Sequence, residues 1–191
     1  AKEISEKNLN FSVLNNSKLG LGGAINLGIE KASGEFICIM MADFSDDIND
    51  LKRYYNLMSE NNCDAIFGSR FILGSKVINY PKDKLILNRI FNLFVKILFL
   101  NRYNDYTNAF KIYKANVLKS FLPLVSESFN IFLEIPLKII SRGYTFKTIP
   151  ISWEGRKKGA AKFKIQELKS KYLFTLLYCL IEKLLLKKRK K

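Results

Sequence analysis

The sequence predicts an α/β domain with a doubly wound, mostly parallel sheet. The first indication is an apolar run of strand length, Phe36–Met41, that leads directly into a cluster of aspartates. The second is the alternation of short apolar runs with segments of helical spacing around it. With 191 residues, of which 48% are hydrophobic, the chain suits one domain with a sizeable core and a peripheral extension.

The N-terminal part of the chain is predicted to alternate strands and helices. Asn and Gly residues indicate a loop over 15–23. The continuous apolar run over 36–41 is typical of a strand that is buried on both faces. In chain order we expect a strand over 11–14, the loop over 15–23, a helix over 24–32, the strand over 36–41, a helix over 51–60 and a strand over 65–67.

The middle of the chain is predicted to be mainly helical. Residues 85–100 are strongly apolar, and their polar residues recur at three- and four-residue intervals, which predicts one polar stripe on an otherwise apolar helix. The stripe consists of Asn88, Arg89, Asn92 and Lys96. Further along we expect helices over 116–121 and 132–141, a strand over 146–153 and a basic loop over 155–159.

The C-terminal segment is long and apolar and ends in the basic run Lys187–Lys191. Its uninterrupted apolar part, 172–181, is too short to span a bilayer, which needs about 20 residues. We therefore divide the chain into a domain over 1–165 and an amphipathic membrane-interface helix with a polybasic tail over 166–191. The alternative is a core helix that closes the domain, followed by a solvated tail.

The net charge of +15 calls for a negatively charged partner, which can be nucleic acid, an anionic membrane surface or a phosphate-bearing substrate. No nucleic-acid-binding motif accompanies the basic residues, so nucleic acid is not an expected partner. Some of the lysines can equally serve solubility alone. The chain has no histidine, and its three cysteines are too dispersed for a disulfide framework, which fits a reducing cytoplasm.

The aspartates after the apolar run at 36–41 suggest a cation site. In open α/β sheets, ligands bind beyond the carboxyl ends of the strands. Carboxylate oxygens there suit Mg²⁺ or Mn²⁺, which would neutralise a diphosphate leaving group. The alternative is an acidic turn in which Asp46, Asp47 and Asp50 cap the following helix.

Several motifs occur together in one order along the chain. They are Gly20–Ala24, Ala32–Phe36, Met40–Asp47, Gly68–Arg70, Asp105–Tyr113, Arg142–Tyr144 and Arg156–Lys162. In this combination the chain resembles glycosyltransferase family 2 and is most similar to its dolichyl-phosphate mannosyltransferase-like branch. The resemblance implies a GT-A fold, a nucleotide-sugar donor, a divalent metal and inversion at the anomeric carbon. The family's first strand and its Pro-x-x-Asn-Glu turn have no counterpart before Gly20, so we expect an N-terminally incomplete domain.

The resemblance also implies roles for individual residues on the donor side. Gly22 and Gly23 would lie at the donor, and Asp43 matches the second acidic residue of the family's Asp-x-Asp motif. Met41 takes the first acidic position, and a thioether is a poor ligand for a hard cation. The expected metal ligands are therefore Asp43, Ser45 and Asp46.

On the acceptor side the resemblance implies a set of phosphate-binding residues. They are Arg70, Lys84, Asn88, Arg156 and Lys162. Asp43, Arg70 and Asp105 would be the catalytic residues. Asp105 either organises the site or has a structural role only.

We therefore expect an enzyme that moves a sugar from a GDP- or UDP-sugar to a polyprenyl (dolichyl or undecaprenyl) phosphate. It would act at the cytoplasmic face of the cell membrane, peripheral or anchored. A phosphate monoester is already anionic near neutral pH and needs charge neutralisation more than a general base. One alternative is a truncated remnant with impaired catalysis. Another is transfer to a saccharide hydroxyl in surface polysaccharide synthesis, with Glu134 or Asp105 as the base.

Overall fold

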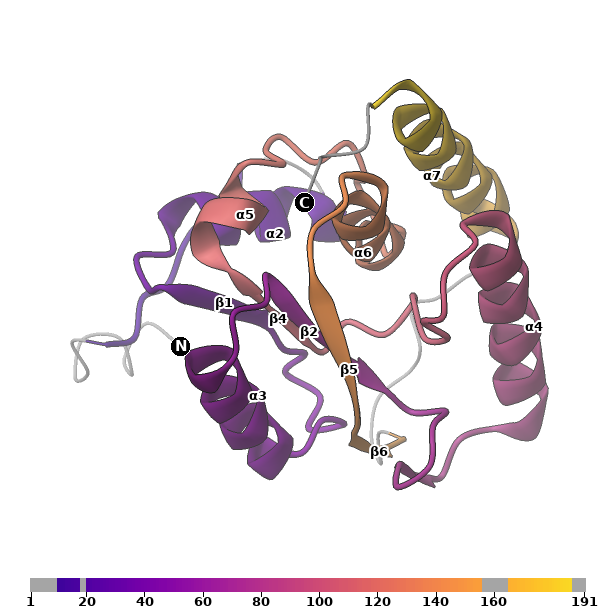
Figure 1. Cartoon of the computed structure of the whole chain (residues 1–191), viewed down its shortest axis with the longest axis horizontal. Coiled ribbons are helices and arrows are strands. Elements are labelled where there is room, and N and C mark those ends of the chain that lie inside the picture. The colour runs from indigo at the N-terminus through magenta and orange to yellow at the C-terminus, as the bar shows by residue number, and fades with distance from the viewer. Residues whose placement is uncertain (1–9, 18–19, 156–164, 187–191) are drawn as a thin grey trace.

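The computed structural model describes residues 10–17, 20–155 and 165–186, with the backbone alone for 165–169. Helices cover both faces of a four-stranded sheet, and a second, two-stranded sheet lies beside it (Figure 1). The helices are α2 (Gly20–Lys31), α3 (Ile48–Glu60), α4 (Lys82–Leu98), α5 (Ala115–Lys119), α6 (Ile131–Ser141) and α7 (Ile165–Leu185).

The main sheet has the order β1 (Phe36–Ile39), β4 (Lys111–Lys114), β2 (Ala65–Ser69) and β5 (Phe146–Pro150). Strand β4 is antiparallel to both of its neighbours, and β2 is parallel to β5. Three of the four strands therefore run in the same direction, as predicted for a mostly parallel sheet. The small sheet pairs β3 (Lys76–Ile78) with β6 (Ser152–Glu154) in parallel.

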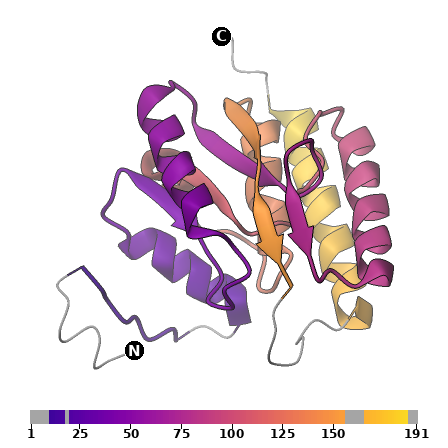
Figure 2. The same ribbon diagram turned by 90° about the horizontal axis from the view of Figure 1, so that it is seen from below.

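Alternating side chains of the strands feed two cores, one on each face of the sheet. On one face Ile66 and Ile112 pack with Tyr54 and Met58 of α3. On the other face Phe67 belongs to a larger core that receives residues of α2, α4, α5, α6 and α7. Figure 2 shows α3 on one side of the sheet and α6 and α7 on the other. This two-sided burial confirms the doubly wound α/β prediction.

Most elements were predicted at nearly their observed positions, but the first two predictions were wrong. Residues 10–17 form no strand, because no described segment pairs with them, and Phe11 and Leu14 are exposed. The predicted loop over 15–23 instead includes the start of α2 at Gly20. There the Gly22 N–H donates to the Glu127 carbonyl at 3.0 Å, so the glycines serve close helix–loop packing.

The predicted strand over 146–153 is broken at Ile151. Strand β5 pairs with β2 up to Pro150, and β6 pairs with β3 from Ser152 onward. Ile151 itself is buried between the two sheets. The break matters for function because it carries the chain across the carboxyl end of β2.

Helix α7 is the predicted C-terminal helix, and its inner face packs against α6. Leu176 and Cys179 are buried there, and Glu182 pairs with Lys138 at 3.2 Å. Its outer face is also apolar, so the helix is present but the predicted amphipathic division into polar and apolar faces is not shown. Within the described residues, no helix is long and apolar enough to cross a membrane. The division of the chain at residue 165 stays a prediction.

Candidate active site

The chain leaves β1 through a turn that brings three oxygen-bearing side chains together. They belong to Asp43, Ser45 and Asp46, the three residues that the sequence analysis named as metal ligands; that role stays a prediction. The Ser45 N–H donates to Asp43 Oδ1 at 3.2 Å. The turn is clamped to β6, because the Glu154 N–H donates to the Ser45 carbonyl at 2.9 Å and Asp46 forms a β-bridge with Trp153.

The electrostatics of this turn favour a cation. Burial raises the pKa of the Asp46 carboxyl to about 6; the Met41 N–H lowers it and the neighbouring charge of Asp43 raises it. The Ser45 hydroxyl is buried and has no hydrogen-bond partner. A hard divalent cation would relieve the repulsion of the two carboxylates and satisfy the hydroxyl oxygen. Two carboxylates and one hydroxyl therefore fit Mg²⁺ or Mn²⁺, although the described residues contain no cluster of three or more acidic, Cys or His ligands.

Met41, which takes the first acidic position of the Asp-x-Asp motif, contacts the apolar core of this chain. Its side chain is partly buried and packs against the larger hydrophobic core. A thioether facing that core adds nothing to a hard-cation site.

The other aspartates of the acidic turn serve the neighbouring structure. Asp47 is the N-cap of α3 and accepts the Asn49 N–H at 2.8 Å. Asp50 is buried and accepts the Ser152 N–H at 2.7 Å. The capping interpretation thus holds for Asp47, whereas the Asp46 carboxyl accepts a hydrogen bond from the Met41 backbone N–H.

The second half of the site is a buried ion pair between Arg70 and Asp105. Arg70 Nε and Nη2 donate to the two carboxylate oxygens at 2.9 and 2.7 Å, and the Arg70 backbone N–H donates to Oδ2 at 2.9 Å. Burial opposes the guanidinium charge, but Asp105 raises the pKa of Arg70 above its ordinary value. The bidentate contact fixes the plane of the guanidinium.

Aromatic rings surround Arg70 and connect it to the acidic turn. Its guanidinium lies 5.2 Å from the centroid of Phe71 and 5.6 Å from those of Tyr80 and Trp153. Trp153 is also the residue that forms the β-bridge with Asp46. The acidic turn and the Arg70 ion pair, which are separate in sequence, therefore meet at Trp153.

A buried lysine that the sequence analysis did not single out supports the segment around Asp105. Lys111 Nζ donates to the carbonyls of Tyr106, at 3.3 Å, and Asn108. Burial lowers the pKa of Lys111 to about 7, against the opposing influence of Asp105. The sequence signal that could have identified Lys111 is its position inside the motif 105–113, directly before the apolar pair Ile112 and Tyr113.

The two predicted acceptor residues on α4 have different surroundings. Asn88 points inward and donates to the Tyr80 hydroxyl at 3.0 Å and to Thr107 Oγ1 at 3.2 Å. Lys84 is exposed on the first turn of the helix. Asn88 is thus linked to Arg70 through the ring of Tyr80, and the role of both residues towards phosphate stays a prediction.

The remaining predicted site residues are not brought to this cluster by any described contact. Gly22 packs against the 126–127 backbone, where an added Cβ would lie 1.9 Å from the Ser126 carbonyl oxygen. Its neighbour Gly23 lies in the same turn of α2. Arg156 and Lys162 lie outside the described residues.

Glu134, the alternative general base, is fully buried in α6. Its carboxylate accepts the N–H groups of Val125 and Ser126 at 3.1 and 2.8 Å and lies 3.8 Å from Lys138 Nζ. These contacts give the Glu134 carboxylate a structural role, in which it holds residues 125–126 against α6.

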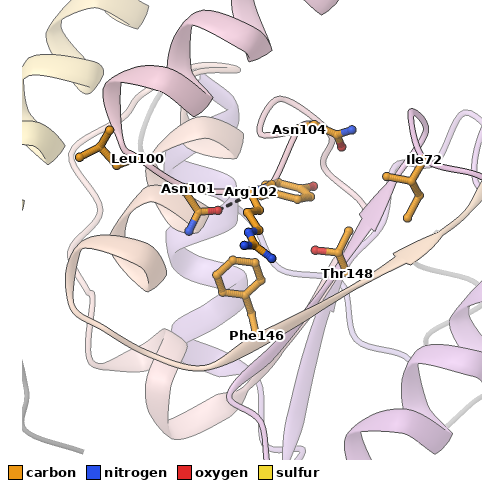
Figure 3. Close-up of a pocket in the computed structure, with 8 residues that line it drawn as sticks. Ile72, Leu100, Asn101, Arg102, Asn104, Phe146 and Thr148 are labelled. Atoms are coloured by element: carbon orange, nitrogen blue, oxygen red, sulfur yellow. Dashed lines mark hydrogen bonds between the residues drawn. The ribbon is translucent and has the colours of Figure 1, made fainter.

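A separate surface pocket of about 410 Å³ lies beside the segment that precedes Asp105 (Figure 3). Its lining consists of Ile72, Leu100, Asn101, Arg102, Tyr103, Asn104, Phe146 and Thr148, and includes no predicted site residue. Two of its lining residues contact the site: the Tyr103 hydroxyl donates to the Asp105 carbonyl at 2.6 Å, and Asn104 Oδ1 accepts the Ser69 hydroxyl at 2.7 Å.

The protein-family model described as glycosyl transferase family 2 matches residues 1–122 of the chain. Polyprenol monophosphomannose synthase from Mycolicibacterium smegmatis is 26% identical over 151 residues, which cover 76% of this chain and 57% of that protein. Undecaprenyl-phosphate mannosyltransferase from Micrococcus luteus is 24% identical over 152 residues, which cover 76% of this chain and 61% of that protein. The chain thus spans only about three fifths of the length of these relatives.

Among solved structures, glucosyl-3-phosphoglycerate synthase from Mycobacterium tuberculosis in complex with Mg²⁺ and UDP has a TM-score of 0.63 at 10% identity. The match covers 85% of this chain and 55% of that structure. A complex of the same synthase with Mn²⁺, UDP-glucose and phosphoglyceric acid also has a TM-score of 0.63 at 10% identity. That match covers 85% of this chain and 56% of the solved structure. At this identity the likeness shows the fold, which is of the GT-A type.

Proposed function

Because this chain belongs to glycosyl transferase family 2, we propose that it transfers a sugar from a GDP- or UDP-sugar to a polyprenyl phosphate, with inversion at the anomeric carbon. The observation that carries the proposal is the meeting of the acidic turn and the Arg70–Asp105 pair at Trp153. Together they offer a cation site and a fixed guanidinium, which are the groups needed to bind two phosphate-bearing substrates.

On the donor side, Asp43, Asp46 and the hydroxyl of Ser45 would hold Mg²⁺ or Mn²⁺. The metal, when bound, supplies Lewis-acid stabilisation of the nucleoside diphosphate as it leaves. The clamp between the turn and β6 would keep these oxygens in place. A bound cation would favour the ionised form of Asp46, whose pKa burial raises to about 6, and so keep the carboxylate charged over a wider pH range.

On the acceptor side, Arg70 would orient the phosphate of the polyprenyl lipid. Its fork is held by Asp105 on one edge and by aromatic rings on its faces, so no reorganisation is needed when the phosphate arrives. Asp105 is then a positioning residue rather than a base. Lys84 and Asn88 would extend the phosphate contact along α4.

Acceptor chemistry distinguishes this proposal from transfer to a saccharide hydroxyl. A hydroxyl acceptor would need a general base, whereas a phosphate monoester is already ionised near neutral pH. The two candidate bases, Glu134 and Asp105, each have their carboxylate oxygens engaged by internal donors. Because neither carboxylate is available as a general base, these hydrogen bonds favour a phosphate acceptor over a hydroxyl acceptor. The similarity to two polyprenyl-phosphate mannosyltransferases supports the same choice.

The location that follows is the cytoplasmic face of the membrane, where nucleotide sugars and the lipid phosphate meet. Three free cysteines, Cys38, Cys63 and Cys179, are compatible with a reducing compartment.

The test is sugar transfer in detergent from a panel of GDP- and UDP-sugars to undecaprenyl phosphate, with and without Mn²⁺. We expect a lipid-linked product from at least one donor, dependent on Mn²⁺ and lost in Asp43→Ala. Tyr55→Glu, an exposed change on α3, serves as the control and should retain full turnover. Folded protein that yields no product from any donor would refute the proposal and favour the remnant alternative.

A further inference from the structure

Helix α4 turns Asn88 and Asn92 towards the protein and a stripe of large apolar side chains towards the surface. Six large apolar side chains of this helix each expose at least 50% of their surface: Ile86, Leu87, Ile90, Leu93, Phe94 and Ile97. Their spacing places them on one helical stripe. An exposed apolar stripe of this length marks an interaction surface.

The inward side of α4 explains why the helix cannot turn its apolar stripe into the core. Asn92 is only 1% exposed, and its Oδ1 accepts the Tyr106 N–H at 2.6 Å. Its Nδ2 donates to the Asn88 carbonyl at 2.9 Å, and Asn88 bonds Thr107 in turn. Rotating the helix would leave these buried amides and the Tyr106 N–H without hydrogen-bond partners, and each unpaired group would cost stability. The apolar stripe is therefore fixed outward.

Helix α7 lies beside α4 and extends the apolar surface (Figures 1 and 2). The rings of Phe91 and Tyr172 meet at 5.6 Å, and Lys183 Nζ donates to the Phe99 carbonyl. Six apolar side chains of α7 also expose at least 50% of their surface: Leu173, Phe174, Leu177, Ile181, Leu184 and Leu185. We call these twelve side chains the α4–α7 face.

The charges around the α4–α7 face identify its occupant. Among the residues of the two helices whose side chains the structure describes, the exposed charged ones are Lys82, Asp83, Lys84, Arg89 and Lys171, of which four are basic. In the sequence, five further basic residues follow Leu186. A second copy docked on this face would bring like charges together. An anionic bilayer instead offers both a hydrocarbon boundary for the apolar residues and negative charge for the lysines.

We propose that the α4–α7 face docks the protein onto an anionic bilayer, with both helices at the lipid surface. The inference rests on the proposed function and deepens it, since it assigns the side of the enzyme from which the lipid acceptor arrives. The Asn88 amide on the inner side of α4 donates to Tyr80, whose ring packs on Arg70, so the acceptor site would lie directly behind the docked helix.

The test measures co-flotation of the whole chain with vesicles of phosphatidylglycerol and phosphatidylcholine. The variant is Ile90→Glu with Ile97→Glu, which removes two apolar contacts and adds two negative charges on α4. The matched control is Ile48→Glu with Tyr55→Glu on α3, where the side chains are 55% and 59% exposed against 61% and 64% on α4. Circular dichroism checks that both variants fold.

We expect the α4 variant to lose at least tenfold in vesicle partitioning, and the α3 control to stay within twofold of the parent. Vesicles of phosphatidylcholine alone should bind the parent several-fold more weakly. Equal partitioning of the two variants would overturn the proposal. So would a lipid-free dimer, seen by light scattering, that the α4 substitutions dissociate. Vesicle binding requires no donor sugar, so its failure is distinguishable from a failure of sugar transfer.

Discussion

The buried pair of Arg70 and Asp105 is central to the proposed site, and removing one partner has a calculable consequence. The two side chains are 7% and 0% exposed, and three hydrogen bonds of 2.7 to 2.9 Å join the carboxylate to Arg70. Asp105→Ala would leave a buried guanidinium and a backbone N–H without their partner. Breaking a buried ion pair in this way costs about 3–5 kcal/mol. A domain typically has only about 5–15 kcal/mol of stability in total, so the loss would be large.

The assay is equilibrium unfolding in urea at pH 7, followed by far-ultraviolet circular dichroism. Glu30→Ala is the control, because its ion pair with Lys31 is exposed on both sides and should contribute less than about 1 kcal/mol. Replacing both partners by apolar residues, Arg70→Met with Asp105→Leu, should cost less than the sum of the single changes. A loss below about 1 kcal/mol for Asp105→Ala would refute the inference that the pair is a closed, buried unit.

Three further changes test other parts of the site. Burial lowers the pKa of Lys111 to about 7, so the folded state disfavours its charge; this unfavourable contribution is complete below pH 7 and disappears as the pH rises towards the unfolded pKa. Lys111→Met should therefore gain more stability, relative to the parent, at pH 6 than at pH 9.5 in urea unfolding; an equal change at both pH values would contradict this. Burial raises the pKa of Asp46 to about 6, so its carboxylate destabilises the metal-free fold above that pH and not below pH 4. Asp46→Asn should raise the melting temperature at pH 8 without metal and abolish the rise that Mn²⁺ gives the parent; a retained Mn²⁺ effect would exclude Asp46 as a ligand. Glu134→Gln should lose about 1–3 kcal/mol of stability, because it weakens a buried acceptor of two N–H groups. The variant should keep its turnover per folded molecule; a loss of turnover without a matching loss of folded protein would indicate that Glu134 acts as the base.

Local sequence patterns were sufficient for the elements that carry the site. The apolar run at 36–41 predicted a strand, and β1 forms over Phe36–Ile39. The predicted burial on both faces was wrong, because β1 is an edge strand in which only Ile37 is buried. The polar stripe of α4 was also visible in its spacing. Its orientation was not, since only their partners on the 105–108 segment show that Asn88 and Asn92 face inward, whereas Arg89 is exposed.

The features that sequence reasoning missed depend on contacts between distant segments. The break at Ile151 arises because two different strands, β2 and β3, pair with the two halves of one apolar run. No local sequence motif marks Trp153 as a site residue, although it connects Asp46 to Arg70. Lys111 looked like one more lysine in a basic chain, and only its burial under the 105–108 segment reveals its role.

The preference for a phosphate acceptor is tested most directly by comparing two lipids that differ in one group. Sugar transfer would be measured, with Mn²⁺ and the donor that the panel identifies, to undecaprenyl phosphate and to undecaprenol. We expect product from the phosphate, none from the alcohol, and loss of the product in Arg70→Met, because the guanidinium binds the phosphate and no free carboxylate acts as a base. Comparable transfer to undecaprenol would contradict the proposed acceptor.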